Sequence, residues 1–379
     1  MVKWSVYLTT AYRPCESQRN VFDRTQAMMQ AAESLGYDGA WLLEHHFTRY
    51  GICGSPLMMA GNILGATKRL KVGTAVTVIP LEHPVRLAEN VALLDQMSGG
   101  RLRFGIGRGY FFKDYEVLGA DIRKNTEMMT VWMDIILSAW ITGKCKAENK
   151  FLNFPEVPIY PEPLTKPHPP VYVACSSPTR TEWAARRGFP MLMDYLAEDE
   201  EKLAQLELYR QVAAESGHDP DAVDHVLSGV AYVGDRNLAD RIREHLVWWE
   251  HEQLNASKLF APENRGVENY AYYHRQREAA ILRGNWTPES RCERILQLSP
   301  TGSPEQCIER LQHTVDVTGI RHIALGFEGL GETDIILDSM YRFMIEVAPH
   351  VKSYGGPWNA ESTVQAETAA KRADVGSAK

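Results

Sequence analysis

Cysteine is scarce in this chain, and its placement excludes two kinds of site. The six cysteines among 379 residues are scattered, with no Cys-x-x-Cys pair and no Cys/His cluster. Structural zinc sites and disulfide frameworks both need closely spaced ligands or a dense cysteine pattern. We therefore expect reduced thiols, a cytoplasmic location and no metal site.

Long apolar runs and an excess of basic charge are also missing. No segment approaches the roughly 20 apolar residues of a membrane span, and the apolar run at the amino terminus is too short for a signal peptide. The formal net charge is -7, whereas nucleic-acid-binding proteins usually carry a basic surface. Neither a membrane nor nucleic acid is an expected partner. With 44% hydrophobic and 23% charged residues, the composition is that of a globular protein.

What the chain does contain is a regular alternation of short β-rich segments and helical patterns. The eight β-rich segments are residues 4–8, 39–43, 70–79, 101–106, 171–175, 190–193, 226–233 and 322–327. Helical patterns lie near residues 21–35, 56–67, 84–97, 125–142, 179–187, 199–216, 237–250, 304–317 and 333–348. Eight such units over 250 or more residues predict an α/β fold, the TIM (β/α)8 barrel.

A doubly wound open sheet is the competing fold. It would favour a complete Gly-x-Gly-x-x-Gly loop between a strand and a helix. The segment Gly105-Ile106-Gly107-Arg108-Gly109 resembles that loop but lacks its final spacing. The motif is therefore only weak evidence for dinucleotide binding.

Three segments depart from the alternation. Residues 145–170 are rich in proline and predict a surface insertion before the fifth strand. Residues 260–298 have few core positions and predict a mobile loop over the active site. The small, polar residues 351–379 predict a disordered tail, which leaves residues 1–350 as a single barrel domain.

The run Glu44-His45-His46-Phe47 directly follows the second predicted strand. In a TIM barrel the active site lies at the carboxyl ends of the strands, so ionisable groups at this position are candidates for catalysis. Successive side chains point in different directions, and we expect His45 to face a pocket while His46 packs or forms a hydrogen bond. Both histidines could also be purely structural.

Other predicted strand ends carry groups that suit a phosphate. Arg108 follows the fourth strand, and Ser176, Ser177, Thr179 and Arg180 follow the fifth. Hydroxyls, backbone N–H groups and guanidinium charge together favour a bound dianion. The alternative is that the serines and threonine merely cap a helix. Candidates to line a pocket for a planar ring and an apolar substrate are Tyr7, Trp41, Tyr110, Phe111, Phe112 and Tyr195, whereas Trp248 and Trp249 suggest packing or a subunit interface.

Several motifs together resemble a known family. They include Glu44-His45-His46-Phe47, His83-Pro84-Val85-Arg86, Leu93-Leu94-Asp95-Gln96-Met97-Ser98 and Thr318-Gly319-Ile320. Over about residues 1–350 the chain is similar to the α subunit of bacterial luciferase and the luciferase-like flavin monooxygenases. These proteins are TIM barrels that take reduced FMN (FMNH2) from a separate NAD(P)H:flavin reductase. They form a C4a-(hydro)peroxyflavin with O2, which oxygenates an aldehyde or another carbonyl compound.

The resemblance implies a two-component FMNH2-dependent monooxygenase acting on an apolar aldehyde, another carbonyl compound or a biosynthetic intermediate, and a homodimer. It gives His45 the catalytic role, in proton transfer. It places a non-proline cis peptide at Ala75-Val76 beneath the flavin ring, the phosphate near Arg108, Ser176, Ser177, Thr179 and Arg180, and the ring near Glu44, Tyr110 and Tyr195. It assigns the substrate pocket to Tyr7, Gly107, Phe111 and Glu328.

The chain also departs from the luciferase α subunit. Gly107 stands where that subunit has its reactive cysteine, which is expected to open space beside the flavin. Ser176 replaces a glutamate, Arg180 a threonine, Tyr195 a tryptophan and Thr126 an arginine. Arg180, Arg123 or Lys124 could restore the charge at the phosphate site. These changes favour flavin use without light emission.

Two other functions stay open at this point. Related barrels use the deazaflavin F420 for hydride transfer, which would make the protein an F420-dependent oxidoreductase. A non-catalytic flavin-binding subunit like the luciferase β chain is the other alternative. That subunit would be expected to lack the long loop and the His45 pocket.

Overall fold

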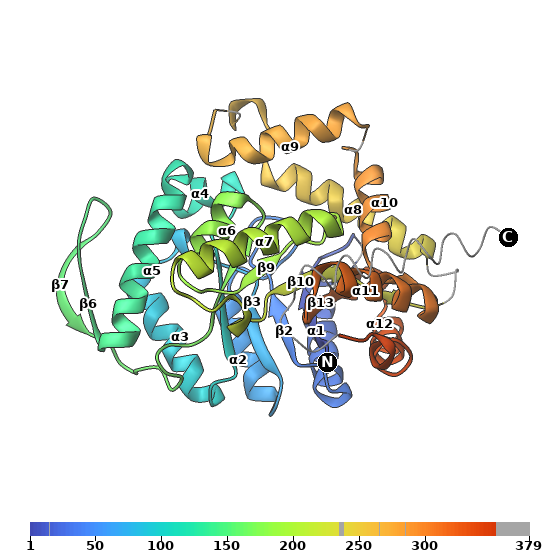
Figure 1. Ribbon diagram of the computed structural model, residues 1–379, viewed down its shortest axis with the longest axis horizontal. Coiled ribbons are helices and arrows are strands. Elements are labelled where there is room, and N and C mark those ends of the chain that lie inside the picture. The colour runs from blue at the N-terminus through green and yellow to red at the C-terminus, as the bar shows by residue number, and fades with distance from the viewer. Residues whose placement is uncertain (15, 235–238, 265, 285, 354–379) are drawn as a thin grey trace.

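The computed structural model describes residues 1–353, except residues 15, 235–238, 265 and 285. The predicted tail therefore lies almost entirely outside the described residues. Within the described part of the chain, eight parallel strands form a closed barrel, in the order β3-β2-β1-β13-β10-β9-β8-β5, and a pairing between β3 and β5 completes the circle (Figure 1). They are β1 (Lys3–Leu8), β2 (Gly39–Leu42), β3 (Lys71–Thr74), β5 (Leu102–Gly107), β8 (Val171–Cys175), β9 (Met191–Met193), β10 (Val226–Val230) and β13 (His322–Gly326). The predicted TIM barrel is confirmed.

The strands are short apolar runs because both of their faces are buried. Every residue of β2 and β13 is buried. One face of the sheet packs against the surrounding helices, and the other fills the barrel with a small cluster of Tyr7, Trp41, Val226 and Ala324. Gly73 leaves room for this cluster, since a Cβ there would lie 2.4 Å from the Trp41 ring.

Helices surround the barrel close to the predicted ranges. They are α1 (Gln18–Leu35), α2 (Pro56–Ala66), α3 (Pro84–Ser98), α5 (Asn125–Thr142), α6 (Pro178–Ala185), α7 (Asp199–Glu215), α8 (Ala239–Ser257), α11 (Pro304–Thr318) and α12 (Thr333–Arg342). Local signals explain their ends: Ser303 caps α11 by accepting from the Gln306 N–H, and Gly319 ends it with φ 67°. The sequence did not predict α4 (Phe112–Leu118).

Two predicted strands are divided in the structure. The predicted strand 70–79 consists of β3 and β4 (Thr77–Val78), separated by the Ala75–Val76 peptide bond, which is cis. The predicted strand 226–233 consists of β10 and β11 (Tyr232–Val233), and β11 pairs with β12 (Thr301–Gly302) outside the barrel.

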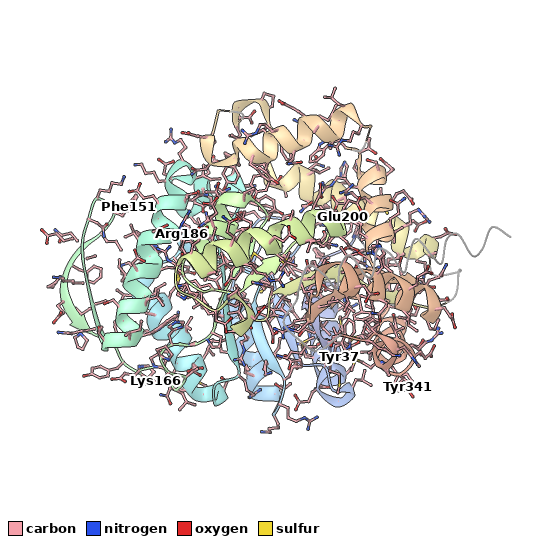
Figure 2. All side chains as sticks on the ribbon, in the orientation of Figure 1. Tyr37, Phe151, Lys166, Arg186, Glu200 and Tyr341 are labelled. Atoms are coloured by element: carbon pink, nitrogen blue, oxygen red, sulfur yellow. The ribbon has the colours of Figure 1, made fainter. Side chains whose placement is uncertain are left out.

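The proline-rich insertion is an antiparallel hairpin of β6 (Lys144–Glu148) and β7 (Asn153–Pro158). It projects from the body beside α5, at the left of Figure 1. Phe151, labelled in Figure 2, lies in the turn of the hairpin and packs edge-on against Trp132 of α5, with ring centroids 5.7 Å apart. The surface insertion was predicted, but its strands were not.

The 260–298 segment is more ordered than the sequence suggested. It contains two short 3-10 turns, Pro262–Asn264 and Glu268–Tyr270, followed by α9 (Ala271–Leu282) and α10 (Pro288–Leu298). Cys292 and Ile295 of α10 are fully buried, so this helix belongs to the packed body. Helix α9 lies across the top of the molecule above α8 (Figure 1). The sequence did not predict these helices, and the mobility of the segment stays a prediction.

The described part of the chain offers no helix with the length and hydropathy needed to cross a bilayer. Its five described cysteines are unpaired and buried.

Candidate active site at the carboxyl ends of the strands

A cavity of about 190 Å³ opens at the carboxyl ends of the barrel strands. Its lining includes at least one residue from each of the eight strands or from the loop that follows it, together with Trp249 and Gln253 of α8. Seven of the residues predicted for the site line this cavity: Tyr7, Trp41, Ala75, Val76, Tyr110, Ser176 and Tyr195. The topology of the barrel thus brings together side chains that are far apart in the sequence.

Three aromatic rings form a stack along this cavity. The rings of Tyr50 and Trp249 lie 4.8 Å apart at an interplanar angle of 16°, and those of Trp249 and Tyr195 lie 6.3 Å apart at 24°. Tyr50 was not predicted from the sequence, and Trp249 was predicted to serve in packing or a subunit interface. Trp249 instead lines the cavity, because α8 passes over the barrel mouth. Burial raises the pKa of the Tyr50 and Tyr195 hydroxyls, which keeps both neutral at physiological pH.

His45 lies behind Tyr50 and is not part of the cavity wall. Its ring contacts Tyr50 edge-on at 4.5 Å and Phe111 at 5.3 Å, and only 7% of its surface is exposed. Its Nδ1 atom is buried and makes no hydrogen bond within the described residues. Burial, and to a lesser extent the nearby His46, lowers the pKa of His45 to about 3. At neutral pH the imidazole is therefore uncharged, and its burial opposes protonation.

The Glu44 carboxylate contacts a backbone N–H group and the side chain of His46. Its carboxylate accepts a hydrogen bond from the Val78 N–H at 3.1 Å and lies 3.2 Å from Nε2 of His46. This contact with Glu44 raises the pKa of His46. Neither residue lines the cavity. His46 packs and forms a hydrogen bond, as the sequence predicted for one of the two histidines.

Arg108 and Arg180 form a cationic region beside the cavity. The Arg108 guanidinium donates to the Thr126 hydroxyl at 3.2 Å. Arg180 is 8% exposed, and its Nη1 atom is buried without a hydrogen-bond partner within the described residues. Burial, and then the charge of Arg108, lowers the pKa of Arg180 to about 10. A buried cation with a free donor is the arrangement expected where an anion binds.

The other groups proposed for a phosphate are more exposed. Ser176 and Thr179 are exposed, and Ser177 is the amino-terminal cap residue of α6, although its hydroxyl makes no capping bond. The two other candidate cations, Arg123 and Lys124, both pair with Asp121, at 2.9 and 3.8 Å. Of the three alternatives raised from the sequence, Arg180 is thus the one with a buried, unpaired donor.

The remaining predicted residues surround the cavity without lining it. A Cβ on Gly107 would lie 2.5 Å from Cγ2 of Val76, so Val76 fills the space that glycine was expected to open. Phe111 is buried between His45 and Tyr110. The buried Glu328 carboxylate accepts from the Thr9 N–H at 2.6 Å and the Thr9 hydroxyl at 2.8 Å, which ties the end of β13 to the end of β1.

The 260–298 segment is fastened to the loop after β5 through Tyr270. The Tyr270 hydroxyl donates to the Gly109 carbonyl at 2.6 Å and accepts from Nδ2 of Asn125 at 2.7 Å. The Arg108 guanidinium lies over the Tyr270 ring, 4.4 Å from its centroid. The segment therefore contacts Arg108, one of the two arginines of the cationic region.

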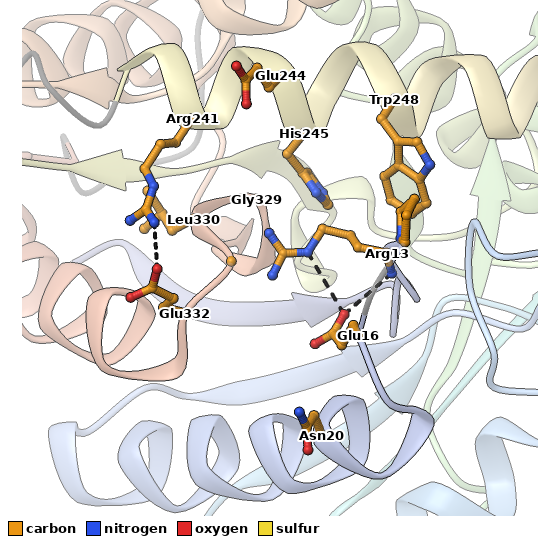
Figure 3. Close-up of a pocket in the computed structure, with 12 residues that line it drawn as sticks. Arg13, Glu16, Asn20, Arg241, Glu244, His245, Trp248, Gly329, Leu330 and Glu332 are labelled. Carbon is orange, nitrogen blue, oxygen red and sulfur yellow. Dashed lines mark hydrogen bonds and ion pairs between the residues drawn. The ribbon is translucent and has the colours of Figure 1, made fainter.

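A larger and more open hollow of about 590 Å³ lies on the outer surface, between α8 and the loops after β1 and β13 (Figure 3). Its two arginines are already paired: Arg13 with Glu16 at 3.8 Å, and Arg241 with Glu332 at 2.5 Å. His245 points into it from α8 (Figure 3). Because both of its arginines are already paired, this hollow is a weaker candidate than the cavity inside the barrel mouth. The described residues also contain no group of His, Cys, Asp and Glu side chains arranged to hold a metal ion.

Comparison with known proteins gives one consistent family. The model of the family described as luciferase-like monooxygenase matches residues 3–322. The alkanal monooxygenase alpha chain of the Kryptophanaron alfredi symbiont is 40% identical over 93% of this chain and 99% of its own length. That of Aliivibrio fischeri is 40% identical over 84% of this chain and 90% of its own length. An alkanal monooxygenase beta chain, from Photorhabdus laumondii, is 24% identical over 87% of this chain and 94% of its own length.

Solved structures share the fold at low sequence identity. The oxygenating constituent of 3,6-diketocamphane monooxygenase from Pseudomonas putida, in complex with FMN, has a TM-score of 0.75 at 18% identity, covering 93% of this chain and all of the other. An F420-dependent secondary alcohol dehydrogenase has a TM-score of 0.72 at 18% identity, covering 93% of this chain and 99% of the other.

Proposed function

The chain belongs to the luciferase-like monooxygenase family of flavin-dependent enzymes, and we propose that it is the oxygenating component of a two-component system. In this proposal it takes FMNH2 from a separate NAD(P)H:flavin reductase and uses O2 to oxygenate an apolar aldehyde, another carbonyl compound or a biosynthetic intermediate. Reduced flavin, when bound, would supply the reactivity toward O2. The similarity to alkanal monooxygenase alpha chains supports an apolar substrate.

One observation carries the flavin proposal: the buried Nη1 of Arg180 has no hydrogen-bond partner among the described residues, and Arg180 lies close enough to Arg108 for the two charges to interact. A phosphate dianion would satisfy the free donor and neutralise both guanidinium groups. The residues therefore fit the phosphate of FMN. Ser176, Ser177 and Thr179 stand at the start of α6, where they would add hydroxyl donors.

The cavity of about 190 Å³ is smaller than the roughly 300 Å³ or more of typical ligand pockets. A flavin ring therefore requires part of the aromatic stack to move aside. Movement of Tyr50 would also expose His45, which now lies behind it. Exposure would relieve the burial that lowers its pKa, and we propose that His45 then serves as a proton acceptor near neutral pH.

The test of the function is a rapid-mixing experiment. Protein and photoreduced FMN are combined without O2, O2 is admitted, and the return of oxidised-FMN absorbance is followed. We expect the return to be much slower than with free FMNH2. Equal rates with and without the protein would refute the monooxygenase proposal.

Two variants separate binding from chemistry in the same assay. His45→Ala should sharply reduce product formation and leave FMN binding within a few fold, and unchanged turnover would remove His45 from the mechanism. Arg108→Ala should instead weaken FMN binding, by about 1.5–3 kcal/mol for a charge-assisted contact. Arg123→Ala is the matched control, because Arg123 is exposed and paired with Asp121.

F420-dependent hydride transfer is the second candidate, because the F420-dependent alcohol dehydrogenase shares this fold. Comparing the affinities for reduced FMN and reduced F420 would distinguish the two enzymes. A non-catalytic role like that of the luciferase β chain is less well supported. The beta chain is 24% identical to this chain, against 40% for the alpha chain, and this chain has the 260–298 segment.

We also propose a homodimer in the cytoplasm. Three large apolar side chains are exposed on α2 and α3: Met58 at 78%, Leu93 at 47% and Met97 at 73%. Such a patch suits a subunit interface. Analytical ultracentrifugation of the wild type and of Met58→Glu would test the dimer. The five unpaired, buried cysteines suit a reducing compartment.

A further inference from the structure

A chain of polar side chains runs from α10 to the cavity. Glu250 of α8 is fully buried and forms an ion pair with Nε of Arg291. Nη2 of Arg291 donates to Oε1 of Gln253 at 3.3 Å, and Nε2 of Gln253 donates to the Tyr110 hydroxyl oxygen at 2.9 Å. Gln253 and Tyr110 both line the cavity. None of the first three residues was a site candidate from the sequence.

The chemistry of arginine fixes which groups donate and which accept in this series of hydrogen bonds. A guanidinium can only donate hydrogen bonds, so the Gln253 oxygen must face Arg291 and its NH2 group must face Tyr110. Consequently the Tyr110 oxygen accepts in this contact, and its own hydrogen is not used there. Among the described residues this hydroxyl makes no other hydrogen bond, although the Asp194 carboxylate lines the same cavity and interacts with it electrostatically. Its hydrogen is therefore left for the cavity.

We propose that Tyr110 presents a directed hydrogen-bond donor to a carbonyl oxygen of the substrate, and that Gln253, Arg291 and Glu250 are positioning residues that fix this direction. The proposal rests on the proposed function in one respect, namely that the cavity takes an aldehyde or ketone. The walls around Tyr110 are largely apolar, with Ala75, Val76 and Trp249. A carbonyl buried there would lose its hydration, and an aimed donor offsets part of that cost, whereas a hydrocarbon of the same length gains nothing from the donor.

The first measurement uses flavin-free protein and 2-undecanone labelled with 13C at the carbonyl. Infrared difference spectra report the C=O stretch, which falls when the oxygen accepts a hydrogen bond, and calorimetry gives the affinity. Undecane is the matched ligand without an acceptor. We expect Tyr110→Phe to weaken ketone binding about three- to tenfold, to raise the stretch, and to leave undecane binding unchanged.

The second measurement tests the direction. In Gln253→Glu the new carboxylate accepts from both Arg291 and Tyr110, so the tyrosine hydrogen turns away from the cavity. Ketone affinity and C=O stretch should shift to the values of Tyr110→Phe, and combining both substitutions should cause no further loss. Gln253→Leu removes the constraint and should fall between the wild type and Gln253→Glu. A role in folding alone would not move the stretch.

The outcomes are separable from those of the flavin assay. If Tyr110→Phe changes neither the stretch nor the ketone affinity, or if it weakens undecane binding as much as ketone binding, the donor is not there and this inference is wrong. If Gln253→Glu keeps the wild-type stretch while Tyr110→Phe loses it, the positioning role is wrong. If the infrared spectra show the directed donor but the protein does not delay flavin oxidation, only the proposed function is refuted.

Discussion

Replacing Arg180 with methionine should stabilise the protein prepared without flavin and abolish its stabilisation by FMN. The pKa of this guanidinium is lowered to about 10, against an ordinary value near 12.5, mainly by burial and then by Arg108. That difference corresponds to roughly 3 kcal/mol of unfavourable free energy for burying the charge. At pH 7 the group is charged in both the folded and the unfolded chain, so the cost is fully present there. It disappears only as the pH rises from about 10 toward 12.5.

Methionine keeps much of the volume and removes the charge, so urea unfolding at pH 7 should show a gain of about 1–3 kcal/mol. At an FMN concentration of 100 times Kd, the wild type should gain about 2.7 kcal/mol from the ligand, and Arg180→Met should gain little. Arg187→Met is the matched control. Arg180 and Arg187 both lie over the Trp183 ring, 5.6 and 4.2 Å from its centroid, but Arg187 pairs with Asp134 and is partly exposed. A destabilised Arg180→Met protein that still responds fully to FMN would refute the anion-site reasoning.

Three further predictions concern stability and the 260–298 segment. Burial lowers the pKa of three histidines to about 3: His45, His225 and His245. Unfolding below pH 6.5 should therefore take up as many as three protons. In urea titrations the free energy of unfolding should fall by up to about 4 kcal/mol for each unit by which the pH is lowered. A free energy of unfolding that stays constant between pH 6.5 and 5 would contradict this. Gly107→Ala should lower the free energy of unfolding by about 1–3 kcal/mol in the same assay, because the new Cβ meets Val76. Adding Val76→Ala should recover most of this loss. If the double variant recovers nothing, the strain lies elsewhere. Tyr270→Phe should speed limited proteolysis of the 260–298 segment about tenfold, whereas Tyr273→Phe should not. Of these two tyrosines, Tyr270 is the one whose hydroxyl forms hydrogen bonds to the loop after β5 and to Asn125. Equal proteolysis rates for the two variants would show that another contact fastens the segment.

The barrel was predictable because its strands are buried on both faces. Such strands appear in the sequence as short apolar runs between amphipathic helices, and the eight-fold alternation then fixes the architecture. The cis peptide at Ala75–Val76 was expected from the family resemblance and is present. The strand positions and the family resemblance together indicated seven residues of the cavity, since the barrel topology places the strand ends together.

Other parts of the site depend on contacts that no local pattern records. Trp249 and Gln253 reach the cavity because α8 crosses the barrel mouth, and a helical repeat does not reveal which helix does so. The space beside Gly107 is filled by Val76, a side chain of the neighbouring strand connection. Helix α9 has no fully buried residue, so it lacks the apolar stripe by which a helix is found in a sequence.

Arg108 is shared between two structures, since it contacts the Tyr270 ring of the 260–298 segment and also faces Arg180. An anion bound by Arg108 and the docking of that segment must then influence each other by the same free energy in both directions. Loss of the segment would appear as lower cofactor affinity, even though none of its residues touched the phosphate. Conversely, resistance of the segment to a protease would be a direct measure of how much cofactor is bound.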